Sequence, residues 1–296
     1  MDGDRMISLN EQGLSRRNAL KATATGAALG TTFALSVQPV QAQTMITTPA
    51  DGLTAGVVKV KTRDGKEMDA YRAMPATGQA FATILVVQEI FGVHAHIADL
   101  CRRFAKAGYY AIAPELYFRQ GDAKAVSDMQ ALLREIVSKV PDEQVMGDLD
   151  ATVDFAKGEG KADVAKLGIT GFCWGGRIVW LYAAHSAALK AGVAWYGRVV
   201  GDSTPMTPKH PIDIAKDLKA PVLGLYGGAD TGIPNESVDK MRAALKAGSP
   251  AAQKSQIDTY PDTPHGFNAD YRPSFRKEQA EDAWKKALAW FKANGV

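Results

Sequence analysis

The hexapeptide GFCWGG at residues 171–176 is the feature that most restricts the possible folds of this chain. The apolar run at 166–170 before it is typical of a strand end, and the apolar run at 177–184 after it is typical of a buried helix. Small residues two positions before and two positions after Cys173 remove the side chains that would collide in a sharp strand-to-helix turn. The sequence therefore predicts a nucleophile elbow with cysteine in place of serine.

Such a turn favours nucleophilic chemistry at Cys173 in two ways. It places the sulfur at a helix N-terminus, where the positive end of the helix dipole favours thiolate over thiol. It also directs the backbone N–H of Trp174 at the oxyanion that forms on an attacked carbonyl. A glycine-flanked cysteine is also compatible with a small core residue, because cysteine is among the most buried residue types. On this segment alone both interpretations stay open.

The chain after residue 42 alternates between strand and helix patterns with short connections, which predicts an α/β fold of the α/β-hydrolase type with a mostly parallel sheet and helices on both faces. The pair Asp64-Gly65 predicts an antiparallel entry hairpin. We expect one domain over residues 43–296. Strands are predicted at 56–62, 67–73, 82–87, 109–114, 166–170, 191–196, 221–226 and 255–260, and helices at 95–107, in two segments of 117–158 with the second beginning at Pro141, and at 177–184, 236–245 and 280–291.

Residues 1–42 have the pattern of an export signal. Arg16 and Arg17 precede a weakly apolar, uncharged run at 22–37, and small residues lead to a cleavage point after Ala42. The paired arginines resemble a twin-arginine signal, which implies contact with export machinery and a periplasmic or secreted mature protein. The apolar run is shorter than the roughly 20 residues that span a bilayer, so we expect no stable membrane anchor.

Composition excludes several classes of protein. A formal net charge of +3 is too small to indicate a nucleic-acid or anionic membrane surface. Two cysteines, Cys101 and Cys173, cannot form a disulfide framework. The sequence has neither a phosphate-binding glycine fingerprint nor spaced metal ligands. We therefore expect neither a metal nor an organic cofactor.

A nucleophilic cysteine needs a base and an acid that orients the base. In an α/β-hydrolase these partners follow the nucleophile in the order acid, then histidine, on loops after later strands. Among five histidines only His265 follows the last predicted strand. Asp230 lies on the loop after the penultimate strand and is favoured as the acid. Asp262 is the alternative, although its side chain would have to fold back to reach a ring three residues away.

Several short segments together carry a resemblance to a known family. They are QEIFGV at 88–93, PELYFR at 114–119, GDLD at 147–150, GFCWGG at 171–176, WYG at 195–197, GGAD at 227–230 and HGF at 265–267. On these segments the chain resembles the dienelactone hydrolase family over essentially the whole mature sequence. The resemblance implies a triad of Cys173, Asp230 and His265, and an oxyanion hole formed by the N–H groups of Ile90 and Trp174.

Glu89 is a carboxylate predicted at the end of a buried strand beside the elbow, where such a group has few structural reasons to be. Its charge would oppose thiolate formation at rest, or its oxygen would accept the thiol proton. The family resemblance implies both roles in turn: Glu89 keeps the thiol neutral at rest, and it accepts the thiol proton when substrate arrives. A simple ion pair with a nearby arginine is the alternative.

The resemblance also implies substrate contacts. Arg119 matches a position that binds a substrate carboxylate, and Tyr196 resembles a tyrosine of the substrate pocket. The second arginine of the family, four residues after the histidine, is replaced here by Ala269, and the nearest arginine is Arg272. Either Arg272 serves from a shifted loop, or the substrate has one anionic contact fewer.

These observations predict a hydrolase that opens a small dienelactone-like lactone or ester through a thioester on Cys173. Two alternatives remain. The first is a general carboxylesterase that acts on another small ester. The second is a secreted protein of the same fold with a binding or thiol-redox role and no hydrolytic activity.

Overall fold

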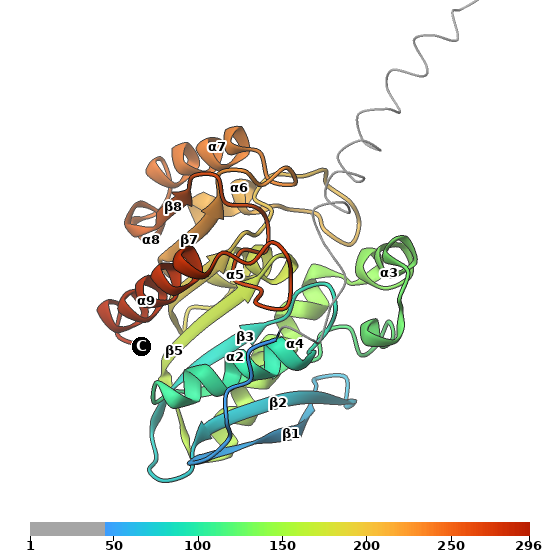
Figure 1. Ribbon diagram of the computed structural model, residues 1–296, viewed down its shortest axis with the longest axis vertical. Helices are drawn as coiled ribbons and strands as arrows, with labels where there is room; N and C mark the ends of the chain where they lie inside the picture. Colours follow the sequence, from blue (N-terminus) through green and yellow to red (C-terminus); the bar gives the residue numbers. More distant parts are fainter. Residues whose placement is uncertain (1–44) are drawn as a thin grey trace, which may run out of the picture.

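The computed structural model describes residues 45–296, so the export signal predicted at 1–42 lies outside the described residues. One eight-stranded sheet, of order β1-β2-β4-β3-β5-β6-β7-β8, runs through the molecule (Figure 1). Strands β4, β3, β5, β6, β7 and β8 are parallel. At the β4 edge of this group, β2 pairs antiparallel with β4, and β1 pairs antiparallel with β2. The strands are β1 (Leu53–Lys61), β2 (Glu67–Pro75), β3 (Phe81–Val87), β4 (Tyr110–Pro114), β5 (Ala162–Phe172), β6 (Leu189–Trp195), β7 (Val222–Gly227) and β8 (Gln256–Tyr260).

Helices cover both faces of the sheet, which confirms the α/β-hydrolase class predicted from the alternating pattern (Figure 1). Helices α2 and α9 share one face, where Phe104 of α2 packs on Trp284 of α9. Helices α4 and α5 share the other, where Tyr182 of α5 donates to Asp150 of α4. The helices are α2 (Ala95–Lys106), α3 (Met129–Glu135), α4 (Asp142–Gly158), α5 (Trp174–His185), α6 (Pro211–Ile214), α7 (Asn235–Lys246), α8 (Pro250–Lys254) and α9 (Lys277–Ala293). Within residues 45–296, none of these helices has the length and apolar character needed to cross a membrane.

The segment from Tyr117 to Asp128 differs from the helical prediction. It forms loops and one 3₁₀ turn at Ala123–Ala125, and α3 begins only at Met129. Aspartate side chains explain the difference, because Asp122 accepts from the Lys124 N–H and Asp128 accepts from the Ala131 N–H. Such local bonds compete with helix propagation and favour helix starts.

Strand β5 is also longer than predicted. It begins at Ala162, which pairs with Phe81 of β3, and a register shift lies between Ala82 and Thr83 before regular pairing resumes. This part of the strand was not predicted, because it contains polar and charged residues and strands were predicted from apolar runs. The buried second half of β5 leads directly to the elbow.

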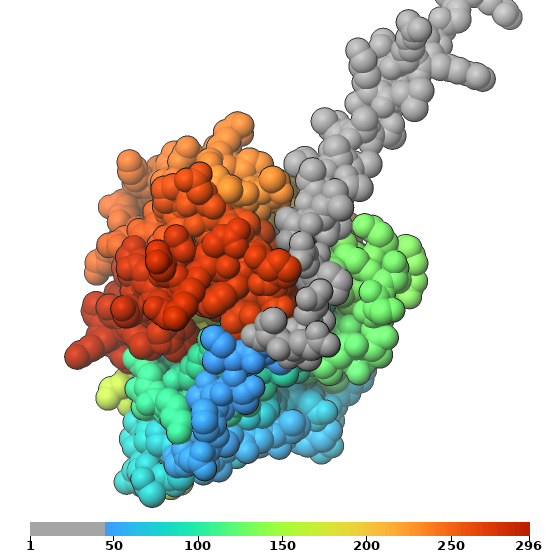
Figure 2. Space-filling model, in the orientation of Figure 1, coloured from blue at the N-terminus to red at the C-terminus, as the bar shows by residue number. Residues whose placement is uncertain are grey.

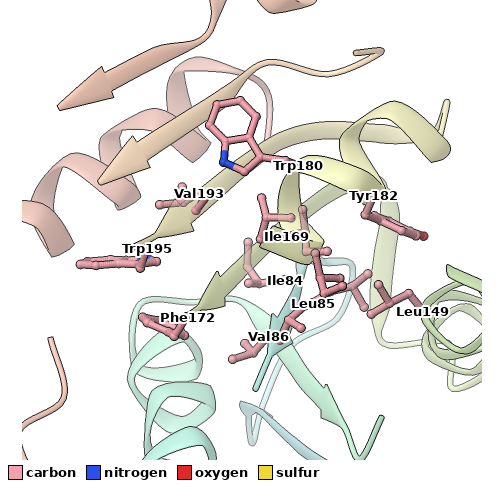
Figure 3. Packing of buried hydrophobic residues seen from close by; sticks show 14 of the residues in the cluster. Ile84, Leu85, Val86, Leu149, Ile169, Phe172, Trp180, Tyr182, Val193 and Trp195 are labelled. Atoms are coloured by element: carbon pink, nitrogen blue, oxygen red, sulfur yellow. The ribbon is translucent and has the colours of Figure 1, made fainter. Parts of the chain in front are cut away.

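The core lies between the central strands and the helices. Figure 3 shows side chains of β3, β5 and β6 meeting those of α5, with Trp180 above the sheet. The central strands are buried on both faces, as their continuous apolar runs require. Their carboxyl ends meet at one edge of the sheet, where the loops that follow β3, β5, β7 and β8 come together.

Helix α5 packs against β3 at a distance that only glycine permits. A Cβ atom at Gly175 would lie 2.5 Å from the carbonyl oxygen of Gln88 and 2.6 Å from that of Val87. Contacts this short with backbone atoms cannot relax by a rotamer change, so one of the two elements would have to move. The glycine therefore sets how closely the helix behind Cys173 approaches the sheet.

We expect Gly175→Ala to destabilise the protein by about 2–3 kcal/mol, because overpacking forces backbone shifts. This corresponds to a melting temperature lower by about 5–10 °C. Gly147→Ala in α4 is the matched control, since a Cβ atom there meets no atom within 4 Å. It should leave stability unchanged or raise it by up to about 1 kcal/mol. Thermal unfolding followed by circular dichroism measures both, and equal melting temperatures for the two variants would contradict this account.

Candidate active site

Cys173 lies at the turn between β5 and α5 in a strained backbone conformation. Its φ is 57° and its ψ is −113°, a region that few non-glycine residues adopt. The Cys173 N–H donates to the carbonyl oxygen of Trp195 at 3.0 Å, and helix α5 begins at the next residue, Trp174. The side chain is buried with 1% exposure. Strand, turn and helix therefore hold the sulfur at the edge of the sheet where the other candidate residues gather.

His265 and Asp230 come from the loops after β8 and β7 and meet beside this turn. His265 Nδ1 and Asp230 Oδ2 are 2.6 Å apart. The Cys173 side chain lies close enough to the imidazole to raise its pKa. Asp230 is itself oriented, because its Oδ1 accepts from the N–H groups of Gly232 at 2.8 Å and Ile233 at 3.1 Å. The fold therefore brings Asp230, His265 and Cys173 together at this edge of the sheet.

Asp262, the alternative acid, is exposed, whereas the Nδ1 atom of His265 is directed at Asp230. The charge of the buried imidazole depends on these neighbours. Burial opposes protonation of His265, but the charges of Asp230 and Cys173 outweigh it and raise its pKa to about 10. The ring is therefore poised to carry a proton at neutral pH.

Glu89 follows β3 and is fully buried. Arg272 Nη2 lies 3.3 Å from Oε1, and His94 Nε2 lies 3.3 Å from Oε2, which also accepts from the hydroxyl of Tyr271. Burial opposes ionisation of Glu89, but the charge of Arg272 and the hydrogen bond from His94 outweigh it and lower its pKa. The carboxylate is therefore charged and held on both oxygens.

The ion pair with Arg272 is the arrangement that sequence reasoning treated as the alternative role for Glu89. The Arg272 side chain has no exposed surface, and its guanidinium carbon lies 5.0 Å from the ring centre of Phe91. Burial opposes its charge, but Glu89, Tyr271 and Cys173 raise the pKa of Arg272. Arg272 thus lies within electrostatic range of the candidate nucleophile.

Of the two predicted oxyanion-hole residues, Trp174 follows Cys173 directly and Ile90 lies on the loop after β3. Trp174 is the first residue of α5, where a backbone N–H has no acceptor within the helix. Ile90 follows Glu89 in a tight turn in which Glu89 and Gly92 form an isolated β-bridge. Gly175 and the carbonyls of Val87 and Gln88 hold these two segments in close contact. The hole itself stays a prediction.

Arg119 has carboxylate partners inside the protein. Its Nη1 and Nη2 atoms donate to Asp148 at 2.6 and 3.0 Å, and its Nε and Nη2 atoms donate to Asp64 at 3.0 and 2.9 Å. The guanidinium also lies over the Phe118 ring, with its carbon 4.2 Å from the ring centre. All three nitrogens are therefore engaged, and its predicted contact with a substrate carboxylate would require these bonds to break.

Tyr196 lies directly against the candidate base. Its ring is edge-on to that of His265 at a centroid distance of 5.0 Å, and its backbone has a positive φ of 38°. Its buried hydroxyl has no hydrogen-bond partner among residues 45–296. A buried hydroxyl without a partner is costly, and a bound polar group would satisfy it. Its predicted role in substrate binding is consistent with this position and is still a prediction.

Two further residues of this site, His94 and Tyr271, were not predicted as site residues from the sequence. Both contact Glu89, and their rings lie edge-on with a centroid distance of 5.2 Å. His94 follows the QEIFGV segment directly and Tyr271 precedes Arg272, so closeness to residues already singled out was the available signal. Among the residues that the structure describes, no cluster of histidine, cysteine or acidic side chains has the arrangement of a metal site.

Comparison with known proteins places this arrangement in a family. A relative from Methylorubrum extorquens, provisionally named a carboxymethylenebutenolidase, is 61% identical over 283 residues, which cover 96% of this chain and 94% of that protein. One of the same provisional name from Salmonella typhimurium is 54% identical and covers 89% of this chain and 96% of its own. A provisionally assigned dienelactone hydrolase from Klebsiella pneumoniae, solved by crystallography, has a TM-score of 0.78 and 53% identity over 81% of this chain and 98% of its own. The model of the dienelactone hydrolase family matches residues 68–295, and the chain belongs to that family.

Proposed function

We propose that this protein hydrolyses a lactone or carboxylic ester through a thioester on Cys173. The observation that carries the proposal is the grouping of Cys173 with the bonded pair His265 and Asp230, in a family of hydrolases. The raised pKa of His265 supports a positively charged imidazolium at neutral pH, which stabilises a thiolate beside it once the thiol proton has been removed. A thiolate is the reactive form of cysteine toward a carbonyl carbon.

In the proposed reaction, the thiolate attacks the carbonyl carbon and a C–S bond forms. The N–H groups of Ile90 and Trp174 stabilise the oxyanion. The C–O bond to the leaving group then breaks, and the leaving oxygen takes the proton of His265. Water gives a proton to the neutral imidazole and attacks the thioester, which releases the carboxylic acid and restores the thiolate. Asp230 holds the ring in position and stabilises its positive charge.

Glu89 has a proposed role in controlling the thiol. Its ion pair with Arg272 and its bonds to Tyr271 and His94 hold the carboxylate in place while no substrate is bound. A substrate that rearranges these contacts frees an oxygen of Glu89 to accept the thiol proton. Arg272 is then available to an anionic group of the substrate, which is one of the two alternatives that the sequence left open for the family's second arginine.

Removal of the nucleophile tests the core of the proposal. We expect Cys173→Ala to lower ester or lactone turnover by on the order of 10³-fold or more, because no acyl-enzyme can form. Mass spectrometry of the quenched wild type should detect one acyl adduct on the peptide that contains Cys173, and none on buried Cys101. Unchanged turnover after alkylation of Cys173 by iodoacetamide would contradict the proposal. An absence of turnover with every ester and lactone would instead favour a binding or thiol-redox protein.

The pKa of His265 provides a second test. We expect Asp230→Asn to lower this pKa well below about 10, because the variant removes the largest interaction that raises it. Because the pKa of His265 is higher in the folded protein than in the unfolded chain, its protonation stabilises the fold. This contribution is complete at pH values below the unfolded pKa near 6.5 and is lost as pH rises through the folded pKa of about 10. The stability difference between wild type and variant should therefore be largest near pH 6 and shrink toward pH 10.

Proton NMR of the His265 ring and melting curves at several pH values measure this effect. Asp262→Asn is the matched control, because it removes an exposed carboxylate three residues from the same histidine. It should leave the pKa of His265 close to that of the wild type. If Asp262→Asn lowers the pKa and Asp230→Asn does not, the assignment of the acid is wrong.

The contacts of Arg119 favour a second candidate, a carboxylesterase whose substrate lacks a second anionic group. Because Asp64 and Asp148 occupy the guanidinium, we expect Arg119→Ala to change KM for a carboxylate-bearing lactone by less than about threefold. Its main effect should be lower stability, since Asp148 is buried and loses its partner. Steady-state kinetics on a carboxylate-bearing lactone and a neutral aryl ester decide the matter. A rise in KM of tenfold or more for the lactone alone would restore Arg119 as a substrate ligand.

A further inference from the structure

A cavity of about 480 Å³ lies between the loop after β3 and the segment that leads into α3. This size is within the range of small-molecule sites. Figure 1 shows α3 standing apart from the sheet, and in Figure 2 the same green segment forms a lobe at the side of the molecule. Most of the lining is apolar, with the side chains of Phe91, Val93, Ala123, Val126, Met129 and Leu132.

The carboxylate of Glu115 ties the two walls of this cavity together. Its Oε2 accepts from the Val93 N–H at 2.9 Å on one wall and from Lys124 Nζ at 2.7 Å on the other. Gly92 makes room for it, because a Cβ atom there would lie 2.7 Å from Glu115 Oε1, and its φ is +73°. These bonds of Glu115 therefore hold the two walls of the cavity in place, and the ammonium group of Lys124 at its rim is paired with Glu115.

The cavity adjoins the buried residues around Glu89 through two side chains that line it. His94 has its Nε2 atom 3.3 Å from Glu89, and Phe91 lies under the guanidinium of Arg272. The Nδ1 atom of His94 accepts from the N–H of His96, so the proton is on Nε2 and is donated to Glu89. One side of each ring thus faces the cavity and another contacts a neighbour of Cys173.

The order of the strands determines which part of a substrate would enter the cavity. Strands β4 and β3, whose following segments form the cavity, lie on one side of β5, and β7 and β8, which carry Asp230 and His265, lie on the other. The leaving oxygen must be next to His265 to receive its proton. The alcohol part of an ester is then directed toward β7 and β8, and the acyl part toward the cavity.

We propose that this cavity is the acyl-binding subsite and that it accepts an uncharged hydrocarbon chain or ring attached to the carbonyl carbon. The proposal rests on the proposed function and specifies its substrate class. Each methylene moved from water into an apolar cavity is worth about 0.8 kcal/mol, which is roughly fourfold in kcat/KM. Selectivity for acyl length should therefore depend on the residues that fill or line this space.

The test uses p-nitrophenyl acetate, butyrate, hexanoate and octanoate, which share a leaving group and differ only in acyl length. For the wild type, kcat/KM should rise from acetate to hexanoate by about fourfold per methylene. Val126→Trp places an indole in the cavity from a partly exposed position. It should lower kcat/KM for hexanoate by at least about tenfold and that for acetate by less than about threefold.

Ala125→Trp is the matched control, because Ala125 is exposed, precedes Val126 and does not line the cavity. Its acyl-length profile should equal that of the wild type. Met129→Trp, from the start of α3, is a second cavity-filling variant if circular dichroism shows that Val126→Trp does not fold. The same loss for acetate and hexanoate in the cavity variants, or a wild-type profile that does not depend on acyl length, would overturn the proposal.

Calorimetric titration with octanoate separates this proposal from the proposed function, because it needs no turnover. Octanoate binding to the wild type and to Ala125→Trp, but not to Val126→Trp or Met129→Trp, supports the subsite even if no ester is hydrolysed. Hydrolysis that depends on Cys173 together with equal octanoate binding by all four proteins would retain the hydrolase and remove the subsite.

Discussion

The backbone at Cys173 is the constraint on which the rest of the site depends. A residue with φ of 57° and ψ of −113° persists only when its surroundings allow no alternative, since such strain costs about 1–3 kcal/mol. Here the surroundings are glycine contacts that bring backbone within 3 Å of where a Cβ atom would be, at Gly171, Gly175 and Gly176. The same close packing that positions the sulfur also brings the end of β3, and with it Glu89, toward Cys173.

Two buried polar systems with opposite roles therefore meet at one sulfur atom. On the β7 and β8 side, Asp230 and His265 stabilise a positive ring that favours thiolate. On the β3 side, Glu89 carries a negative charge that disfavours it, and Arg272 compensates much of that charge. The reactivity of Cys173 is set by the balance between these neighbours. In the proposed mechanism, a ligand that displaces Arg272 from Glu89 changes that balance and so links binding to chemistry without movement of Cys173, Asp230 or His265.

Much of this arrangement was predictable from local sequence, and the remainder depends on distant contacts. The elbow, the entry hairpin at Asp64-Gly65 and the loops that carry Asp230 and His265 follow from glycine placement, apolar runs and the order of elements. The partners of Glu89 come from residues up to 183 positions away, since 272 − 89 = 183. No periodic pattern in the sequence indicates a contact between residues so far apart along the chain. The short bonds of Asp122 and Asp128 likewise overrode a helical pattern, because side-chain acceptors near the backbone compete with the helix.

The wide spacing of Cys173, Asp230 and His265 along the chain has a consequence for biosynthesis. Cys173 emerges from the ribosome 92 residues before His265, since 265 − 173 = 92. At translation rates of about 5–20 residues per second, the thiol waits on the order of 5–20 seconds before its base is made. During that interval a nascent chain has the elbow residues and Glu89 but lacks both groups that favour thiolate. The chemistry proposed for Cys173 therefore cannot begin on a chain that ends before residue 265, because the imidazole is not yet present.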